Sequence, residues 1–284
     1  MVLAQEIMHS FKKSKRRKGS VGFKLDFHKA YDSHEWDFVL VVLRVNGFDQ
    51  KFVSLIQWFI TSVSFTLLLN GCKNSSFTPS RGLRQGDPLS PYLFILCSEV
   101  LSKLIHREVV KGTIHGVKLA PEAPGISSLL YADDVLLFCG AKVGEVEAIL
   151  QCVDKYCAWS GQSVSREKSG IFVSKGVHKQ FIQQVKQQWR FKQVSQGARY
   201  LGTPLFPSKN KSNDFAFVKE KLEARISGWK SKSLSWMGRA TLIKSVALSI
   251  PLYTMSSFKL PKKICQDLDV VVRKFWCNPR KEGN

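Results

Sequence analysis

The chain has 284 residues, 44% of them hydrophobic, so it can bury a core as one large domain or two modest ones. No apolar stretch is long enough to span a bilayer, and the N-terminus lacks an apolar segment followed by a small-residue cleavage site, so we expect a soluble, intracellular protein. The 43 Lys and Arg against 22 Asp and Glu give a formal net charge of +21, which predicts a polyanionic partner. Nucleic acid is favoured over an anionic membrane, because no long basic amphipathic segment stands out.

Residues 3–11 have the apolar spacing of a short helix, and a basic run from Lys12 to Lys18 follows them. Such a run is most often solvated in a loop. Contact with template phosphates and nuclear import are the alternatives. The sequence does not separate these roles.

The first predicted strand carries an acid at its end. Apolar side chains alternate from Val21 to Phe27, which places Asp26 on the opposite face of a half-buried strand. Asp32, followed three positions later by Glu35, then predicts a helix N-cap, and this helix should end at Gly47.

A loop before the next long helix is the second feature of note. After a hairpin centred on Asn70-Gly71, the pair Ser90-Pro91 predicts a helix start, so residues 84–87 should lie at a helix N-terminus. Exposed main-chain N–H groups there favour an anionic or polar ligand. The alternative is a turn in which glycine only permits the bend.

The stretch from Leu129 to Phe138 organises the chain. Two apolar strands flank Ala132-Asp133-Asp134, which predicts a hairpin with two carboxylates at its tip. Adjacent acids repel one another, so a cation is expected to absorb their charge, and oxygen-only ligands suit Mg²⁺. An ordinary turn that uses Asp for its conformation is the alternative reading.

The second half of the chain is predicted to be largely helical, and its C-terminal part is basic. Residues 145–159 form a helix that ends at Gly161, and residues 170–174 form a strand. A polar stretch at residues 208–213 predicts a domain boundary, so the domains are 1–207 and 208–284. Helices follow at 214–227, at 236–249 before Pro251, and at 262–276.

Several motifs in order resemble the reverse transcriptases of plant LINE-type, non-LTR retrotransposons. They are Phe23 to Asp32, Arg81 to Pro91, Tyr131 to Asp134, Arg199 to Gly202, and Gly228 to Lys230. The resemblance implies an α+β fold: a polymerase palm, whose antiparallel sheet packs on helices, followed by a helical basic thumb. It also implies that residues 1–207 hold the palm with only a remnant of the fingers, most of which is missing, as in a fragment of a larger polyprotein.

By this resemblance, Asp26, Asp133 and Asp134 are the catalytic residues. Together with the carbonyl of Phe27 they would hold two Mg²⁺ ions, for which Mn²⁺ can substitute. The reaction is then two-metal nucleotidyl transfer onto a primer 3′-hydroxyl.

The resemblance also implies binding roles. Tyr31 would exclude the ribose 2′-hydroxyl, and Arg84, Gln85 and Lys168 would contact the incoming nucleotide. Tyr200, Leu201 and Gly202 would contact the primer. Without the motifs, Tyr31 is better explained as an aromatic that seals a helix start, and Lys168 as an exposed surface lysine.

The expected partners are an RNA template, a DNA primer and deoxynucleoside triphosphates, with no membrane, and the expected location is nuclear. A catalytically inactive nucleic-acid-binding remnant is the main alternative function. A protein like the group II intron maturases is a further one, which the block from Arg84 to Pro91 and the thumb pattern fit less well.

Overall fold

The computed structural model describes residues 2–13, 19–120, 122–194, 198–206, 211–229 and 234–277. The chain divides into two compact units, His9–Val194 and Met1–Met8 with Ser195–Asn284. We call them the N-terminal unit and the C-terminal unit. Helix α1, Val2–Lys13, confirms the helix expected at residues 3–11, while residues 14–18 of the basic run lie outside the described residues.

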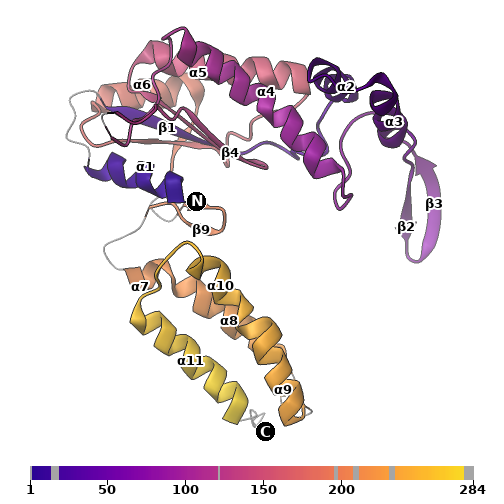
Figure 1. Ribbon diagram of the computed structural model, residues 1–284, viewed down its shortest axis with the longest axis vertical. Helices are drawn as coiled ribbons and strands as arrows, with labels where there is room; N and C mark the ends of the chain where they lie inside the picture. The colour runs from indigo at the N-terminus through magenta and orange to yellow at the C-terminus, as the bar shows by residue number, and fades with distance from the viewer. Residues whose placement is uncertain are drawn as a thin grey trace. The chain divides into compact units, whose positions relative to one another are not determined.

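A five-stranded sheet forms the centre of the N-terminal unit (Figure 1). Its spatial order is β4-β5-β1-β6-β7, antiparallel except for the parallel pair of β6 and β7. The strands are β1 (Ser20–Leu25), β4 (Ser128–Tyr131), β5 (Asp134–Gly140), β6 (Gly170–Val173) and β7 (Lys192–Gln193). The predicted strand before Asp26, the central hairpin and the strand at residues 170–174 are therefore confirmed.

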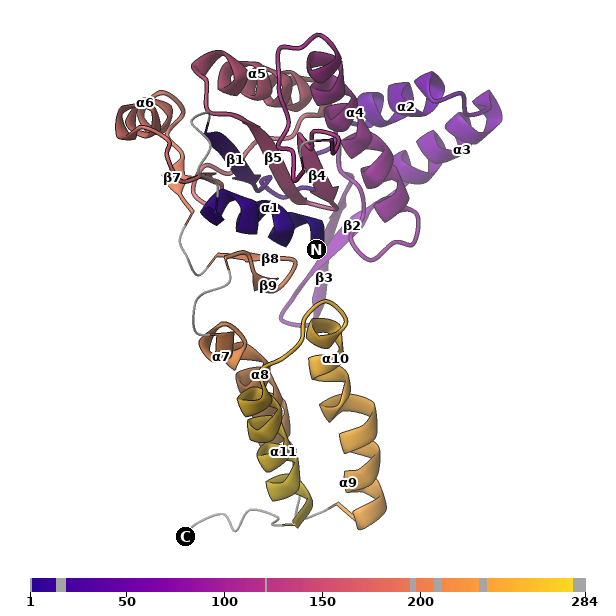
Figure 2. The ribbon, with the colours of Figure 1, turned by 60° about the vertical axis from the view of Figure 1, so that its left-hand side comes forward.

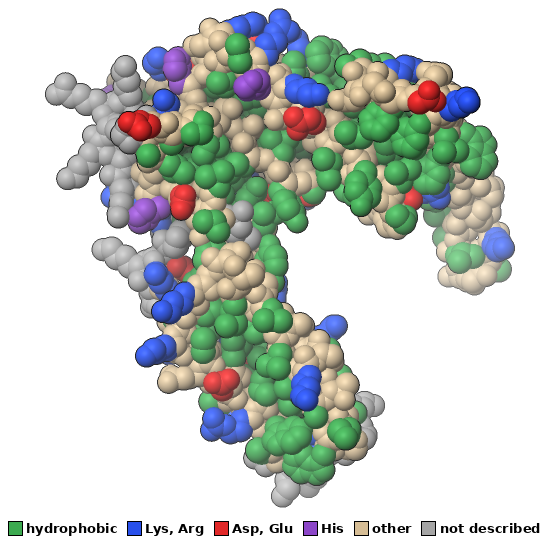
Figure 3. Space-filling view, viewed as in Figure 1, with side chains coloured by type: hydrophobic (Ala, Val, Ile, Leu, Met, Phe, Trp, Pro, Cys, Tyr) green, Lys and Arg blue, Asp and Glu red, His purple; other side chains and the backbone are tan. Residues whose placement is uncertain are grey.

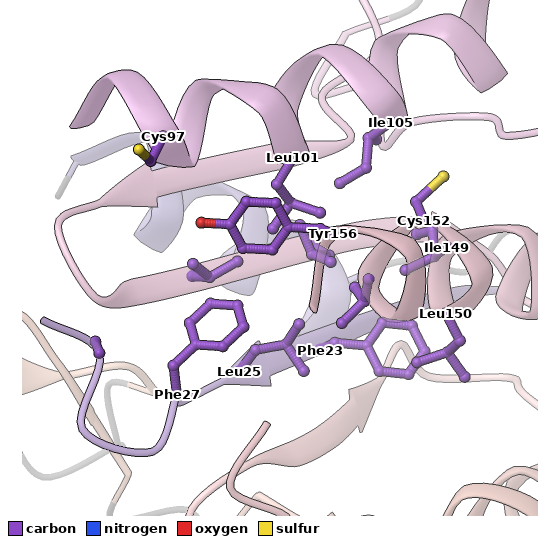
Figure 4. Close-up of a cluster of buried hydrophobic side chains, with 14 of the residues drawn as sticks. Phe23, Leu25, Phe27, Cys97, Leu101, Ile105, Ile149, Leu150, Cys152 and Tyr156 are labelled. Atoms are coloured by element: carbon purple, nitrogen blue, oxygen red, sulfur yellow. The ribbon is translucent and has the colours of Figure 1, made fainter. Parts of the chain in front are cut away.

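Helices α4 (Ser90–Val110) and α5 (Val143–Ser160) cover one face of this sheet (Figure 2). Phe23, Leu25 and Phe27 point together toward this layer, and Phe27 makes an edge contact with Tyr156 of α5 at 5.9 Å (Figure 4). On the other face, Phe11 packs against Phe138 at 6.2 Å. Each of these large apolar side chains contributes about 1.5–3 kcal/mol by leaving water, so their burial anchors β1 and β5 firmly.

Two helices and a separate hairpin lie between β1 and α4. They are α2 (Trp36–Val45), α3 (Gln50–Thr61), β2 (Phe65–Leu69) and β3 (Cys72–Phe77). Asn70 and Gly71 form the two-residue turn of the hairpin with φ values of 52° and 82°, as their sequence predicted. Hydrophobic side chains are exposed over α2 and α3 (Figure 3), among them Trp58, which is 66% exposed.

The predicted N-cap of the first long helix is wrong. Helix α2 begins at Trp36 with Glu35 in the cap position, and the Glu35 side chain makes no capping hydrogen bond. Asp32 instead lies in a turn, where its carboxylate accepts a hydrogen bond from Gln85. At α4 the helix start is confirmed, but Ser90 is the first helical residue, and the Asp87 carboxylate accepts its main-chain N–H at 3.2 Å. Helix α6 (Lys179–Trp189) was not predicted.

The C-terminal unit is a group of helices preceded by a small hairpin. Its elements are β8 (Arg199–Tyr200), β9 (Thr203–Pro204), α7 (Lys211–Asp214), α8 (Ala216–Ser227), α9 (Trp236–Leu242), the π-helix η2 (Ile243–Ala247), α10 (Ser249–Met255) and α11 (Lys262–Cys277). Phe217, Leu222, Ile264 and Leu268 belong to its core. The hairpin packs with these helices through Arg199, which lies over the Phe217 ring at 4.5 Å.

The helix expected to stop before Pro251 continues to Met255. Proline in a helix clashes with the carbonyl four residues earlier, here that of Ala247. Ala247 is the last residue of η2, in which the Leu248 N–H donates to the Ile243 carbonyl at 2.9 Å, one residue farther back than in an α-helix. This wider turn lets Pro251 fit into the first turn of α10. Within the part of the chain that is described, no helix is both long and apolar enough to cross a membrane.

Candidate functional site

The strand ends that carry the three predicted catalytic carboxylates lie next to one another. Strands β1 and β5 pair up to Leu25 and Val135, and Asp26 and Asp134 each adjoin this last pair. Asp133 lies in the two-residue turn between β4 and β5, where Ala132 has a φ of 50°. The sheet register therefore places Asp26 beside the tip of the hairpin.

The faces of the strands separate these acids from the core. Because Phe27 is buried against Tyr156, alternation along the chain turns Asp26 away from the helices. Asp26 is half-buried and Asp133 is exposed. Asp134 forms a half-exposed ion pair with Lys24, with 3.9 Å between Nζ and Oδ1, and such a pair contributes less than about 1 kcal/mol.

The donor atoms suit a divalent cation, but they do not form a closed cage. Among the described residues, no three His, Cys, Asp or Glu side chains group closely enough to hold a metal ion. Mg²⁺ commonly takes only one or two protein carboxylates and completes its coordination with water and phosphate oxygens. An open pair of carboxylates at an exposed edge therefore fits Mg²⁺ chemically, and the convergence of all three acids on one site stays a prediction.

The main chain of Asp26 is held by a turn that precedes β6. Its N–H donates to the Ser169 hydroxyl at 3.0 Å, and its carbonyl accepts the Ser165 N–H at 2.8 Å. Lys168 lies in this turn and is exposed. The sequence motif had singled out Lys168, whereas the two buried serines on either side of it contact Asp26 directly.

Tyr31 lies close to the hairpin tip. Its ring stacks on Phe94 of α4, with 4.7 Å between centroids and 15° between planes. Burial raises the pKa of the Tyr31 hydroxyl, and the negative charge of Asp133 raises the pKa further. The phenol therefore stays protonated and lies within reach of the Asp133 charge.

The loop that contains Arg84 and Gln85 is fastened to the segment around Tyr31. The Leu83 N–H donates to the Tyr31 carbonyl at 2.8 Å, and the Gly82 N–H donates to the His34 carbonyl at 2.7 Å. Gly82 has a φ of 98°, and a Cβ there would lie 2.7 Å from the Asp32 carbonyl oxygen, so only glycine permits this approach. The loop and Tyr31 thus form one rigid segment.

A cavity of about 440 Å³ opens beside this loop. Asp32, Phe59, Arg84 and Gln85 are among the residues that line it. The Gln85 amide donates to Asp32 at 3.2 Å, and the Arg84 guanidinium lies over the Phe59 ring at 5.0 Å. The lining therefore combines an aromatic ring with polar side chains and with charges of both signs.

The predicted primer-contacting residues lie in the C-terminal unit. Leu201 and Gly202 form the turn between β8 and β9, with φ values of 50° and 73°. The Tyr253 hydroxyl of α10 donates to the Leu201 carbonyl at 2.8 Å. Tyr200 is buried, so the turn, and not the tyrosine ring, is the surface of this motif.

Sequence reasoning missed Ser165, Ser169 and Phe94 as parts of the site. A polar residue directly before an apolar strand, as Ser169 is before β6, is a weak signal for a side chain that continues the strand's hydrogen bonds. Phe94 carried no separate signal, because an aromatic on an apolar helix face is ordinary core.

Comparison with known proteins assigns this arrangement to a family. Residues 3–205 match the model described as reverse transcriptase (RNA-dependent DNA polymerase). This match covers most of the chain, so the protein belongs to the reverse transcriptase family. It agrees with the mixed α/β fold and with the antiparallel strands on which the carboxylates lie.

Particular relatives come from mobile elements. The chain is 27% identical over 240 residues to the transposon TX1 uncharacterized 149 kDa protein of Xenopus laevis, which covers 82% of this chain and 18% of that protein. It is 26% identical over 194 residues to the retrovirus-related Pol polyprotein from the type-2 retrotransposable element R2DM of Drosophila melanogaster, covering 68% and 17%. A telomerase structure from Candida albicans, in complex with the TWJ fragment of telomeric RNA, aligns with a TM-score of 0.49 and 10% identity over 98% of this chain and 48% of that one. The chain thus spans less than a fifth of these two retroelement proteins.

Proposed function

We propose that this chain is the palm and thumb portion of a non-LTR retrotransposon reverse transcriptase, of the plant LINE type. It would extend a DNA primer on an RNA template with deoxynucleoside triphosphates. The observation that supports this most strongly is the register of β1 and β5, which sets Asp26 beside the turn that carries Asp133 and Asp134. Carboxylates held near one another repel, and a bound cation would relieve this repulsion.

The roles of the chain's residues follow from their places in the N-terminal unit. Asp26, Asp133 and Asp134, with the Phe27 carbonyl, would hold two divalent cations, Mg²⁺ or Mn²⁺. Such cations activate the primer hydroxyl and neutralise the departing phosphates. Lys24 would release Asp134 when a cation binds, because a half-exposed ion pair is weak.

The cavity beside Gln85 is the proposed nucleotide site. Arg84 would leave the Phe59 ring to contact the phosphates, and the base would then stack on that ring. Tyr31 is bonded through its carbonyl to Leu83 of the loop that lines this cavity, and its ring would occupy the space of a ribose 2′-hydroxyl. Lys168, on the turn beside Asp26, is free to approach the triphosphate because its side chain is exposed.

A second candidate is a nucleic-acid-binding remnant without catalysis. Two observations favour it: the Lys24 pairing of Asp134, and the lack of a group of three metal-binding side chains among the described residues. Such a remnant would keep the charge of +21, and hence its attraction for phosphates.

Primer extension on an RNA template, with Mg²⁺ or Mn²⁺ and beside a filter-binding measurement, separates the two candidates. If the chain is a polymerase, Asp26→Asn and Asp133→Asn should each lower extension by roughly a hundredfold or more while RNA binding changes little. Asp154→Asn is the matched control, because Asp154 is an exposed acid on α5 and its loss should leave extension unchanged. RNA binding without extension by the wild-type chain would support the remnant instead.

A further inference from the structure

Two buried serines frame β6 and bond to opposite ends of β1. Ser169 precedes β6 and Ser174 follows it, and they are 2% and 4% exposed. The Ser169 hydroxyl accepts the Asp26 N–H at 3.0 Å, and the Ser174 hydroxyl accepts the Ser20 N–H at 2.8 Å. Each hydroxyl takes the place of a main-chain carbonyl where the ladder between the strands ends.

The two bonds differ because Asp26 is a proposed metal ligand and Ser20 is not. The ladder with β6 ends at Lys24 and the ladder with β5 ends at Leu25, so Asp26 lies beyond both. Its neighbours are held, Leu25 by the ladder and Phe27 by a bridge to Val164, so the direction of the carboxylate depends on the partners of the Asp26 main chain itself.

The turn from Ser165 to Ser169 supplies these partners. The Ser165 N–H donates to the Asp26 carbonyl at 2.8 Å, and the Ser169 N–H closes the turn onto the Ser165 carbonyl at 2.8 Å. The Ser169 hydroxyl also makes a longer contact of 3.4 Å with the Asp26 carbonyl oxygen. Both polar groups of the Asp26 main chain are thus bonded to a single closed turn.

We infer that Ser169 is a positioning residue that fixes the direction of the Asp26 carboxylate for cation binding. It acts through the Asp26 main chain and touches no reacting atom. The inference rests on the proposed function, because it assumes that Asp26 is a metal ligand. A partner that orients a metal ligand typically changes metal affinity by about 10–100-fold.

The test measures Mn²⁺ binding by the full chain without nucleotide or primer. The electron paramagnetic resonance signal of the free ion reports how much Mn²⁺ remains unbound. Ser169→Ala should weaken Mn²⁺ binding by about 10–100-fold. Ser174→Ala is the matched control, since it removes the same type of bond between the same strands, six residues or about 20 Å along β1. It should bind Mn²⁺ as the wild type does, while the thermal midpoints of the two variants fall by similar amounts. Ser169→Thr keeps the hydroxyl and should retain most of the affinity.

The outcomes separate the inference from the proposed function. If the wild-type chain binds no Mn²⁺, or Asp26→Asn binds as tightly as the wild type, the metal role fails and the inference fails with it. If Asp26→Asn loses binding but Ser169→Ala does not, only the inference is overturned. Equal losses in Ser169→Ala and Ser174→Ala would also overturn it, because the hydroxyl would then serve strand pairing in general.

Discussion

The buried histidine at position 34 should make the N-terminal unit sensitive to mild acid. His34 is fully buried, and its ring stacks on Phe38 and makes an edge contact with Phe94. Among the described residues, neither ring nitrogen has a hydrogen-bond partner. Burial lowers the pKa of His34 from 6.5 to about 4. The folded protein therefore excludes a proton that the unfolded chain binds readily.

The sign and size of the effect follow from this difference in pKa. Well above pH 6.5 the imidazole is neutral in both states, so it does not change the free energy of unfolding. As the pH falls from 6.5 to about 4 only the unfolded chain gains the proton, so the free energy of unfolding decreases by up to about 1.4 kcal/mol per pH unit. Between pH 7.5 and pH 5 the loss attributable to His34 is about 2 kcal/mol.

Urea unfolding at the two pH values, followed by circular dichroism and tryptophan fluorescence, measures this loss. With an m-value of about 2 kcal/mol per molar, the wild-type midpoint should fall about 1 M farther than that of His34→Phe, which keeps the ring and removes the titration. His106→Gln removes an exposed histidine of α4 and should behave as the wild type does. An equal fall in the midpoints of the wild type and His34→Phe would refute the reasoning.

Two further predictions concern the substrates. Tyr31→Ala should raise the incorporation of ribonucleotides relative to deoxynucleotides in primer extension, while Tyr31→Phe, which keeps the ring on Phe94, should stay selective; unchanged selectivity in Tyr31→Ala would count against steric exclusion. RNA binding should weaken with salt, with a log–log slope of about −0.7 per phosphate contact for single strands, and salt-insensitive binding would contradict the role given to the lysines and arginines.

The local parts of the fold were predictable because short patterns determine them. Alternating apolar residues gave β1 and the hairpin of β4 and β5. Asn70-Gly71 gave a two-residue turn because both residues accept positive φ. Gly161 likewise ends α5 with a φ of 74°. In each case the signal and the structure lie within a few residues of one another.

The parts that could not be predicted depend on partners far away in the chain. Asp32 fitted a capping pattern, yet its carboxylate bonds to Gln85, 53 positions later. The hydroxyl that holds the Asp26 N–H belongs to Ser169, 143 positions later. No local pattern identifies such a partner, so the sequence indicated the carboxylates of the site but not the groups that support them.

The wide turn η2 also sets the direction in which α10 presents its side chains. A π-helical turn holds one residue more than an α-helical one, and each residue turns an α-helix by about 100°. If Ile243–Ala247 closed into an α-helical repeat with all of its residues kept, every later side chain of α10 would rotate by about that angle. Tyr253 would then point away from the Leu201 carbonyl that its hydroxyl now bonds. The wide turn thus absorbs one residue without rotating α10, so the hydrogen-bond pattern of this segment keeps Tyr253 directed at the turn of Leu201 and Gly202.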